Sequence, residues 1–145
     1  MKIRKATKKD IKALTKLFNE SKYLWGADRA KIEKYTLDNI KDYFNKRNID
    51  FFIICEEQGK IIGTLLAQLW RGYAYLHTLV VSKKHKDKGI GTALMDFFEK
   101  EVKKRKLKLI EVEAHTNNKI MFNFLKERKF KIGEKLTFFY KEIKK

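Results

Sequence analysis

The residues best suited to chemistry are two glycines and the lysines before them in the segment Lys86–Gly91, whose sequence is Lys-Asp-Lys-Gly-Ile-Gly. This segment follows a β-prone apolar run and comes directly before a helical pattern. The first turn of a helix has unpaired N–H groups and lies at the positive end of the helix dipole. Glycines let a phosphate approach the backbone, and Lys86 and Lys88 add positive charge. We therefore expect a pyrophosphate site at this loop.

The spacing of the glycines leaves three interpretations. A P-loop requires Gly-x-x-x-x-Gly-Lys-[Ser/Thr], which no segment matches. A dinucleotide fingerprint requires a third glycine where the chain has Leu94, although Glu111 follows at the distance of a ribose-binding acid. The strands expected before the loop also form a meander instead of the start of a βαβ unit. The third interpretation is that Gly89 and Gly91 only shape a turn, and the spacing alone does not decide between a turn and a binding site.

The elements that must position this loop form a single domain over residues 1–145. Hydrophobic spacing predicts, in chain order, a strand, two helices, three strands in an antiparallel meander, a helix, a strand, a helix and one or two final strands. The expected ranges are 2–6, 8–20, 32–46, 50–57, 61–70, 73–81, 91–105, 107–113, 118–128 and 130–143. This order indicates an α/β or α+β domain with helices packed on a mixed sheet.

The composition is that of a globular protein, with 43% hydrophobic residues. No apolar run approaches the roughly 20 residues that span a bilayer, and the N-terminus lacks the apolar core of a signal peptide. The single cysteine, Cys55, lies in an apolar predicted strand and is expected to be a buried hydrophobe in a reducing compartment. We therefore expect a cytoplasmic protein without a membrane partner or a metal site.

The charge of the chain is strongly positive, with 35 Lys and Arg against 18 Asp and Glu and a formal net charge of +17. Such a charge favours anionic partners. The lysines are spread along the chain and form no stripe interleaved with exposed aromatic residues, as a nucleic-acid surface would. We therefore expect a lysine-rich surface that contacts nucleic acid only through non-specific charge.

The run Leu79–Leu94 resembles the main motif of the GCN5-related N-acetyltransferase (GNAT) superfamily, [Gln/Arg]-x-x-Gly-x-[Gly/Ala] after a Leu-x-Val strand end. Lys86 occupies the first position, where it keeps the positive charge but lacks the fork of arginine. The order of elements also matches that fold over nearly all 145 residues. The segment Asn118–Phe130 looks like the second motif, in which Met121, Leu125 and Lys129 replace the usual Ala, Tyr and Gly. The resemblance implies a mixed, mostly antiparallel twisted sheet, about four flanking helices and a splayed strand pair at the cofactor site.

The resemblance also implies that acetyl-coenzyme A is the cofactor. The Leu79 N–H would polarise the thioester carbonyl, the main chain near Val81 would pair with the pantetheine arm, and Asn118 would lie near the sulfur. Amides of the glycine loop would hold the pyrophosphate. The implied cofactor-binding residues are Leu79, Val80, Val81, Lys86, Asp87, Lys88, Gly89, Ile90, Gly91, Thr92 and Asn118. The alternative is that Leu79, Val80 and Val81 only form a core strand. Both interpretations can hold together, because the cofactor contacts would use the backbone while the side chains pack.

Acetyl transfer to an amine requires a neutral nitrogen, so a base or a chain of waters must remove the ammonium proton. Strand alternation predicts that Tyr75, His77 and Leu79 share the face offered to the thioester. His77 is the titratable group best placed to act as the base, or else it is a structural histidine. Glu113, after the next predicted strand, is a second candidate base or an ordinary solvated carboxylate.

The acid that protonates the leaving thiolate stays open, because relatives usually have a tyrosine where this chain has Leu125. Either Tyr140 or Tyr75 supplies the proton, or water does. A further alternative is that the chain binds coenzyme A with little turnover.

Acceptor specificity in this fold comes from the loop between the first two helices and from the last strands. Trp25 could wall an acceptor pocket, Asp28 could pair with a cationic amine, and Tyr75 would face the same site. Alternatively, Trp25 caps the core and Asp28 caps the second helix.

These observations together favour an acetyl-CoA-dependent N-acetyltransferase. Its acceptor would be a primary amine, on a small molecule, an amino acid or a protein, that attacks directly in a ternary complex. The alternative is a basic module that binds nucleic acid or an acidic partner on the same scaffold, with little or no turnover. A monomer or a homodimer is expected.

Overall fold

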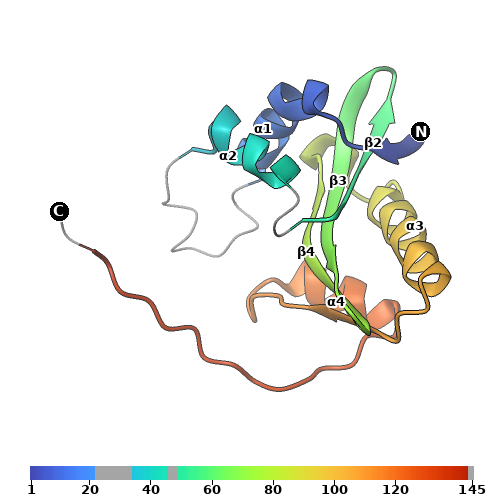
Figure 1. Ribbon diagram of the computed structural model, residues 1–145, viewed down its shortest axis with the longest axis vertical. Helices are drawn as coiled ribbons and strands as arrows, with labels where there is room; N and C mark the ends of the chain where they lie inside the picture. The colour runs from blue at the N-terminus through green and yellow to red at the C-terminus, as the bar shows by residue number, and fades with distance from the viewer. Residues whose placement is uncertain (22–33, 46–48, 144–145) are drawn as a thin grey trace.

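The computed structural model describes residues 1–21, 34–45 and 49–143, which are built around a five-stranded sheet (Figure 1). The strands are β1 (Lys2–Lys5), β2 (Phe51–Glu57), β3 (Lys60–Leu69), β4 (Tyr73–Val81) and β5 (Leu109–Val112). They lie side by side in chain order, with the first four antiparallel and β5 parallel to β4. The predicted fold class, a mixed and mostly antiparallel sheet flanked by four helices, is confirmed.

Helices cover both faces of the sheet. The α-helices are α1 (Ile11–Glu20), α2 (Leu37–Asp42), α3 (Ile90–Lys104) and α4 (Lys119–Glu127), and the short 3-10 helices are η1 (Lys8–Asp10), η4 (Tyr43–Asn45) and η5 (Lys83–His85). Within the described part of the predicted second helix, 32–46, the α-helix begins only at Leu37, because the Thr36 side chain accepts a hydrogen bond from the Asn39 N–H and caps α2 there.

Alternation along the central strands divides the core into two clusters. On one face, Ile54 and Leu66 pack with Leu14 and Phe18 of α1. On the other face, Ile53 and Leu65 of the same strands pack with buried side chains of α3: Leu94, Met95 and Phe98. Neighbouring residues in a strand point to opposite faces, so β2 and β3 contribute to both clusters and read as continuous apolar runs.

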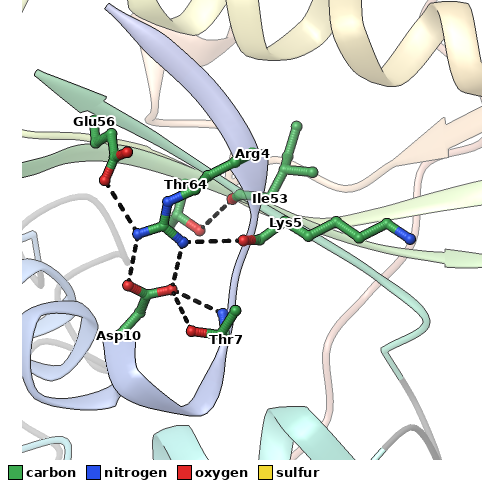
Figure 2. Close-up of polar contacts among 7 residues, drawn as sticks. All are labelled: Arg4, Lys5, Thr7, Asp10, Ile53, Glu56 and Thr64. Atoms are coloured by element: carbon green, nitrogen blue, oxygen red, sulfur yellow. Dashed lines mark hydrogen bonds and ion pairs between the residues drawn. The ribbon is translucent and has the colours of Figure 1, made fainter.

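Arg4 joins the first strand to the first helical turn and to β2 (Figure 2). Its guanidinium donates two hydrogen bonds of 2.9 Å to the Asp10 carboxylate and one of 3.1 Å to Glu56. The Thr7 N–H donates a 2.8 Å hydrogen bond to the same Asp10 carboxylate, which closes the turn that leads into α1. The hydrogen bonds from Arg4 hold the pKa of the Asp10 carboxyl below its ordinary value.

The prediction of one or two final strands over 130–143 is wrong. Residues 130–143 form no helix or strand, and after α4 they run away from the sheet as an extended chain (Figure 1). Their composition suits a strand, but a strand also requires a neighbouring strand that supplies hydrogen-bond partners. This condition is not visible in the sequence of the segment itself.

No helix in the described ranges is long and apolar enough to cross a bilayer. Cys55 is buried in β2, as expected, and burial raises the pKa of its thiol.

Candidate active site

Strands β4 and β5 run together for only four residues and then separate. Their pairing extends from Tyr73 opposite Leu109 to Leu76 opposite Val112. β5 ends there, whereas β4 continues to Val81 with β3 as its neighbour on the other side. Within the described residues, the backbone edge of 77–81 therefore has no strand beside it, and an extended ligand can pair with such an edge.

A β-bulge lies in β4 at the point where the two strands separate. Leu76 is opposite Ala67 and Thr78 is opposite Leu66, so His77 is the extra residue in β4. Leu76 and Leu79 consequently both face the core under α3. Tyr75 points to the opposite face because it precedes Leu76 in a regular stretch of strand. The prediction that Tyr75, His77 and Leu79 share one face is wrong, because the bulge interrupts the alternation on which it depended.

The bulge brings the side chains of His77 and Thr78 together. His77 Nδ1 lies 2.6 Å from Thr78 Oγ1. The His77 ring also meets the ring of Tyr43, from η4, edge-on at a centroid distance of 5.9 Å. Tyr43 belongs to the cluster under α1 and α2, and its burial raises the pKa of its phenol. The His77 imidazole therefore lies on the face of the sheet that α1 and α2 cover. His77 is nevertheless exposed to solvent.

The loop after β4 turns the chain into the N-terminus of α3. Gly89 is the residue before the helix and has φ of +76°, a left-handed conformation that glycine adopts without strain. Its carbonyl accepts the N–H of Ala93, so the amides of Ile90, Gly91 and Thr92 have no partner within the helix. A helix of 15 residues thus presents its positive end just beyond the open edge of β4.

The beginning of α3 is seated closely on β3. A Cβ added to Gly63 would lie 2.9 Å from Ile90 Cγ2 and 3.1 Å from Leu94 Cδ1, so only glycine lets the helix approach here. Sequence reasoning missed Gly63, although a glycine inside an apolar strand was a usable signal. At Gly91, a Cβ would meet Phe124 of α4 at an ordinary 3.7 Å, so space does not dictate that glycine.

The charge and the polar groups of the loop suit an anion. Residues 83–88 contain four lysines and one carboxylate, that of Asp87. Sequence reasoning also missed His85, whose Nδ1 is buried without a hydrogen-bond partner in the described part of the chain. A buried unsatisfied nitrogen costs free energy, which a polar group of a bound molecule or a water would recover. The loop, the helix N-terminus and the open strand edge therefore fit a ligand with an extended arm and a pyrophosphate.

The other predicted site residues lie in different settings. Glu113 is exposed just past the end of β5. Asn118 caps α4, because its Oδ1 accepts the Met121 N–H at 3.1 Å. Trp25 and Asp28 lie outside the described residues.

Tyr140 does not lie at the described site. It is 76% exposed in the extended C-terminal segment, and this follows from the absence of the predicted final strands. Leu125, which occupies the place of the usual tyrosine, is half-buried on α4. The structure therefore brings together His77, the strand edge and the glycine loop, but not Tyr140.

Comparison with known proteins agrees with this geometry. The sequence model of the Acetyltransferase (GNAT) family matches residues 11–130, so the chain belongs to that family. The family uses acetyl-CoA, which confirms the predicted cofactor. An uncharacterized N-acetyltransferase of Methanocaldococcus jannaschii is 27% identical over 99% of this chain, and the match spans 66% of that relative.

Solved structures share the fold. The PaiA N-acetyltransferase of Thermoplasma acidophilum, crystallised with coenzyme A, has a TM-score of 0.80 at 23% identity over 92% of this chain and 91% of its own. An aminoglycoside acetyltransferase from an uncultured soil metagenomic sample, crystallised with sisomicin, has a TM-score of 0.76 at 17% identity over 99% and 96%. The ribosomal-protein-alanine N-acetyltransferase of Brucella melitensis has a TM-score of 0.74 at 19% identity over 88% and 83%. At these identities the likeness establishes the fold.

Proposed function

We propose that this chain transfers the acetyl group of acetyl-CoA to a primary amine by direct attack in a ternary complex. The observation that carries the proposal is the continuity between the open edge of β4 over 77–81 and the N-terminus of α3. An extended pantetheine arm would pair with the backbone edge, and its pyrophosphate would then reach the helix N-terminus and the loop lysines. The relative and the solved neighbours that are named N-acetyltransferases support the choice of an amine acceptor.

The proposed contacts use mainly backbone groups. The main chain of Leu79, Val80 and Val81 would bind the thioester end and the pantetheine arm. The amides from Lys86 to Thr92 would hold the pyrophosphate, as at other helix N-termini. Since the amide oxygen of Asn118 already caps α4, its NH₂ group is the part left to face the ligand.

Acetyl-CoA supplies an activated acyl carbon when it is bound. The acceptor nitrogen forms the new bond to that carbon while the bond from the carbon to sulfur breaks, and the sulfur leaves as a thiolate. The Leu79 N–H donates to the carbonyl oxygen, where negative charge develops during attack. One proton leaves the amine and one reaches the thiolate, so the net products are the acetylated amine and coenzyme A.

His77 is the proposed proton acceptor for the amine. In the tautomer in which Nδ1–H donates to Thr78 Oγ1, Nε2 carries the lone pair that takes the proton. The edge-on contact with Tyr43 restricts the orientation of the ring. Glu113 is the proposed second candidate, because the end of β5 borders the same gap. Water is the proposed proton donor to the thiolate, since Leu125 cannot donate and Tyr140 is remote from the described site.

The acceptor is proposed only as a primary amine, with Trp25 and Asp28 as its proposed contacts from the segment outside the described residues, and with Tyr75 on the α1 side of β4. The proposed compartment is the cytoplasm, where a free thiol such as that of Cys55 is stable.

The test is a screen of acetyl-CoA consumption over small amines, amino acids and peptides, with hydrolysis in the absence of acceptor as the control. We expect consumption above hydrolysis for at least one amine, together with the acetylated product by mass spectrometry. Hydrolysis alone, combined with salt-sensitive retention on DNA, would replace this proposal with a basic binding module.

A further inference from the structure

Helix α4 is held in place differently from the other α-helices of the described chain. Helices α1, α2 and α3 each bury at least one side chain, whereas α4 buries none. Its apolar side chains, among them Met121 and Phe124, are only partly buried against the core under α3. An element with few buried apolar contacts is weakly fixed by packing. The position of α4 therefore depends in larger part on its polar contacts.

Arg128, at the end of α4, makes such contacts with α3. Its Nη2 donates a 2.6 Å hydrogen bond to Asp96 and a 2.8 Å hydrogen bond to Glu99 Oε1, and its Nε donates one of 3.1 Å to the same Glu99 oxygen. The Arg128 side chain is only 14% exposed. Charge-assisted hydrogen bonds from one guanidinium to two carboxylates fix both distance and orientation. Arg128, Asp96 and Glu99 thus form an ion-pair clamp between the two helices.

The clamp lies one helical turn from Phe124, whose ring reaches the first turn of α3. The Arg128 guanidinium lies over this ring, 5.8 Å from its centre. A Cβ added to Gly91 would lie 3.7 Å from the Phe124 ring and 3.8 Å from Val81 Cγ2. Phe124 therefore borders the point where the end of β4 meets the first turn of α3. The pantetheine arm would pass to the pyrophosphate site at this point.

The other end of α4 carries Asn118, the proposed neighbour of the pantetheine arm. The residues before the helix, 113–118, form no helix or strand, so they do not anchor this end to the sheet. Helix α4 has nine residues and therefore spans about 14 Å. A hydrogen-bonded helix of this length moves as one body, so a shift at Arg128 also displaces Asn118.

We propose that Arg128 is a positioning residue for coenzyme A. Through its two carboxylate partners it fixes α4 on α3, and it thereby places Phe124 beside Gly91 and Asn118 beside the pantetheine arm. Its action is indirect, because its guanidinium is engaged by the carboxylates of α3. The inference rests on the proposed function, since it concerns the same cofactor site.

A different role for Arg128 would be to add positive charge near an anionic cofactor. The two roles predict opposite effects of Glu99→Gln, which removes a negative charge. If Arg128 acts only through its charge, Glu99→Gln should bind coenzyme A as tightly as the wild type or more tightly. If Arg128 acts as a clamp, Glu99→Gln should bind coenzyme A more weakly, although the net charge of the chain becomes more positive.

Calorimetric titration of the full chain with coenzyme A tests the clamp, with circular dichroism to show that each variant is folded. We expect Arg128→Ala and Glu99→Gln each to raise the Kd by about 3-fold to 30-fold. The double variant should be no weaker than Arg128→Ala, because both changes remove the same contact. The matched control is Glu101→Gln, which should bind like the wild type. Glu101 also lies on α3 and accepts a 2.9 Å hydrogen bond from an arginine, but this partner, Arg105, belongs to the same end of α3.

Steady-state kinetics with an amine from the acceptor screen separates positioning from a loss of stability. Arg128→Ala should raise the KM for acetyl-CoA by the same factor as the Kd, with kcat nearly unchanged. A variant that is only less stable would instead contain less active protein, which lowers the apparent kcat at an unchanged KM. Wild-type affinity in folded Arg128→Ala, or wild-type or tighter binding in Glu99→Gln, would overturn the clamp. A wild type that does not bind coenzyme A would refute the proposed function, and the clamp with it.

Discussion

His77 Nδ1 lies 2.6 Å from Thr78 Oγ1, although the two residues are consecutive in β4. In a regular strand these side chains would point to opposite faces. The bulge opposite Leu66 and Ala67 allows the contact, and it lies where β5 leaves β4. One irregularity thus orients the candidate base at the point where the edge of β4 loses its neighbouring strand.

If His77 accepts the proton of the amine, replacing His77 should lower turnover. We expect His77→Ala to lower kcat by about 100-fold or more, with little change in coenzyme A affinity. Thr78→Val should lower kcat by a smaller factor, since it removes only the group that orients the imidazole. The control is Thr64→Val, because Thr64 is also buried and donates a 2.8 Å hydrogen bond, to the Ile53 carbonyl (Figure 2). Unchanged turnover in His77→Ala would discard His77 as the base.

Gly63 controls how closely α3 approaches the sheet. Gly63→Ala places a methyl group 2.9 Å from Ile90, so the start of the helix must shift. We expect a loss of about 1–3 kcal/mol in the free energy of unfolding, as for other overpacked sites. Coenzyme A affinity should fall as well, because the shifted residues begin the anion-binding turn. Chemical denaturation and calorimetric titration measure the two effects, and wild-type values in both would refute the close contact.

Lys129 occupies a left-handed position at the end of α4, with φ of +67°. The Phe130 N–H donates to the Leu125 carbonyl and the Lys129 N–H donates to the Lys126 carbonyl, which together form a Schellman motif. Lys129→Gly should therefore raise the free energy of unfolding by about 1 kcal/mol. Lys126→Gly, inside the helix, should lower it by about 1 kcal/mol. If chemical denaturation gives changes of the same sign in the free energy of unfolding for both variants, Lys129 does not occupy a left-handed position at the end of α4.

Asp10 makes the free energy of unfolding depend on pH in the acidic range. Because Arg4 lowers the pKa of Asp10 in the folded chain, its stabilising contribution is complete above the ordinary value of 3.8 and is lost as pH falls through the lower folded pKa. Asp10→Asn should lower the free energy of unfolding by about 1.5–3 kcal/mol at neutral pH. The difference between the variant and the wild type in the free energy of unfolding should shrink once the pH falls below the ordinary pKa of the carboxyl. The exposed Asp38→Asn serves as control, and a difference that grows in acid would contradict the assignment.

The glycine loop and most of the fold could be predicted because their signals are local. Gly89 lies between a strand pattern and a helix pattern, and the strands β2 to β4 have distinct apolar runs. The bulge at His77 could not be predicted, because it depends on the register between β3 and β4. The C-terminal segment shows the same limit, since a sequence of strand composition does not reveal whether a neighbouring strand is present to pair with it.

Calorimetric titration of Gly89→Glu with coenzyme A tests whether the loop before α3 binds the pyrophosphate. Gly72→Glu is the matched control: both glycines have positive φ and open space at the Cβ position, but Gly72 lies in the turn at the other end of β4. Both variants carry a similar backbone strain, so only the position of the new carboxylate differs. We predict that Gly89→Glu abolishes measurable coenzyme A binding while Gly72→Glu binds like the wild type. Wild-type affinity in a folded Gly89→Glu variant would exclude this loop as the pyrophosphate site.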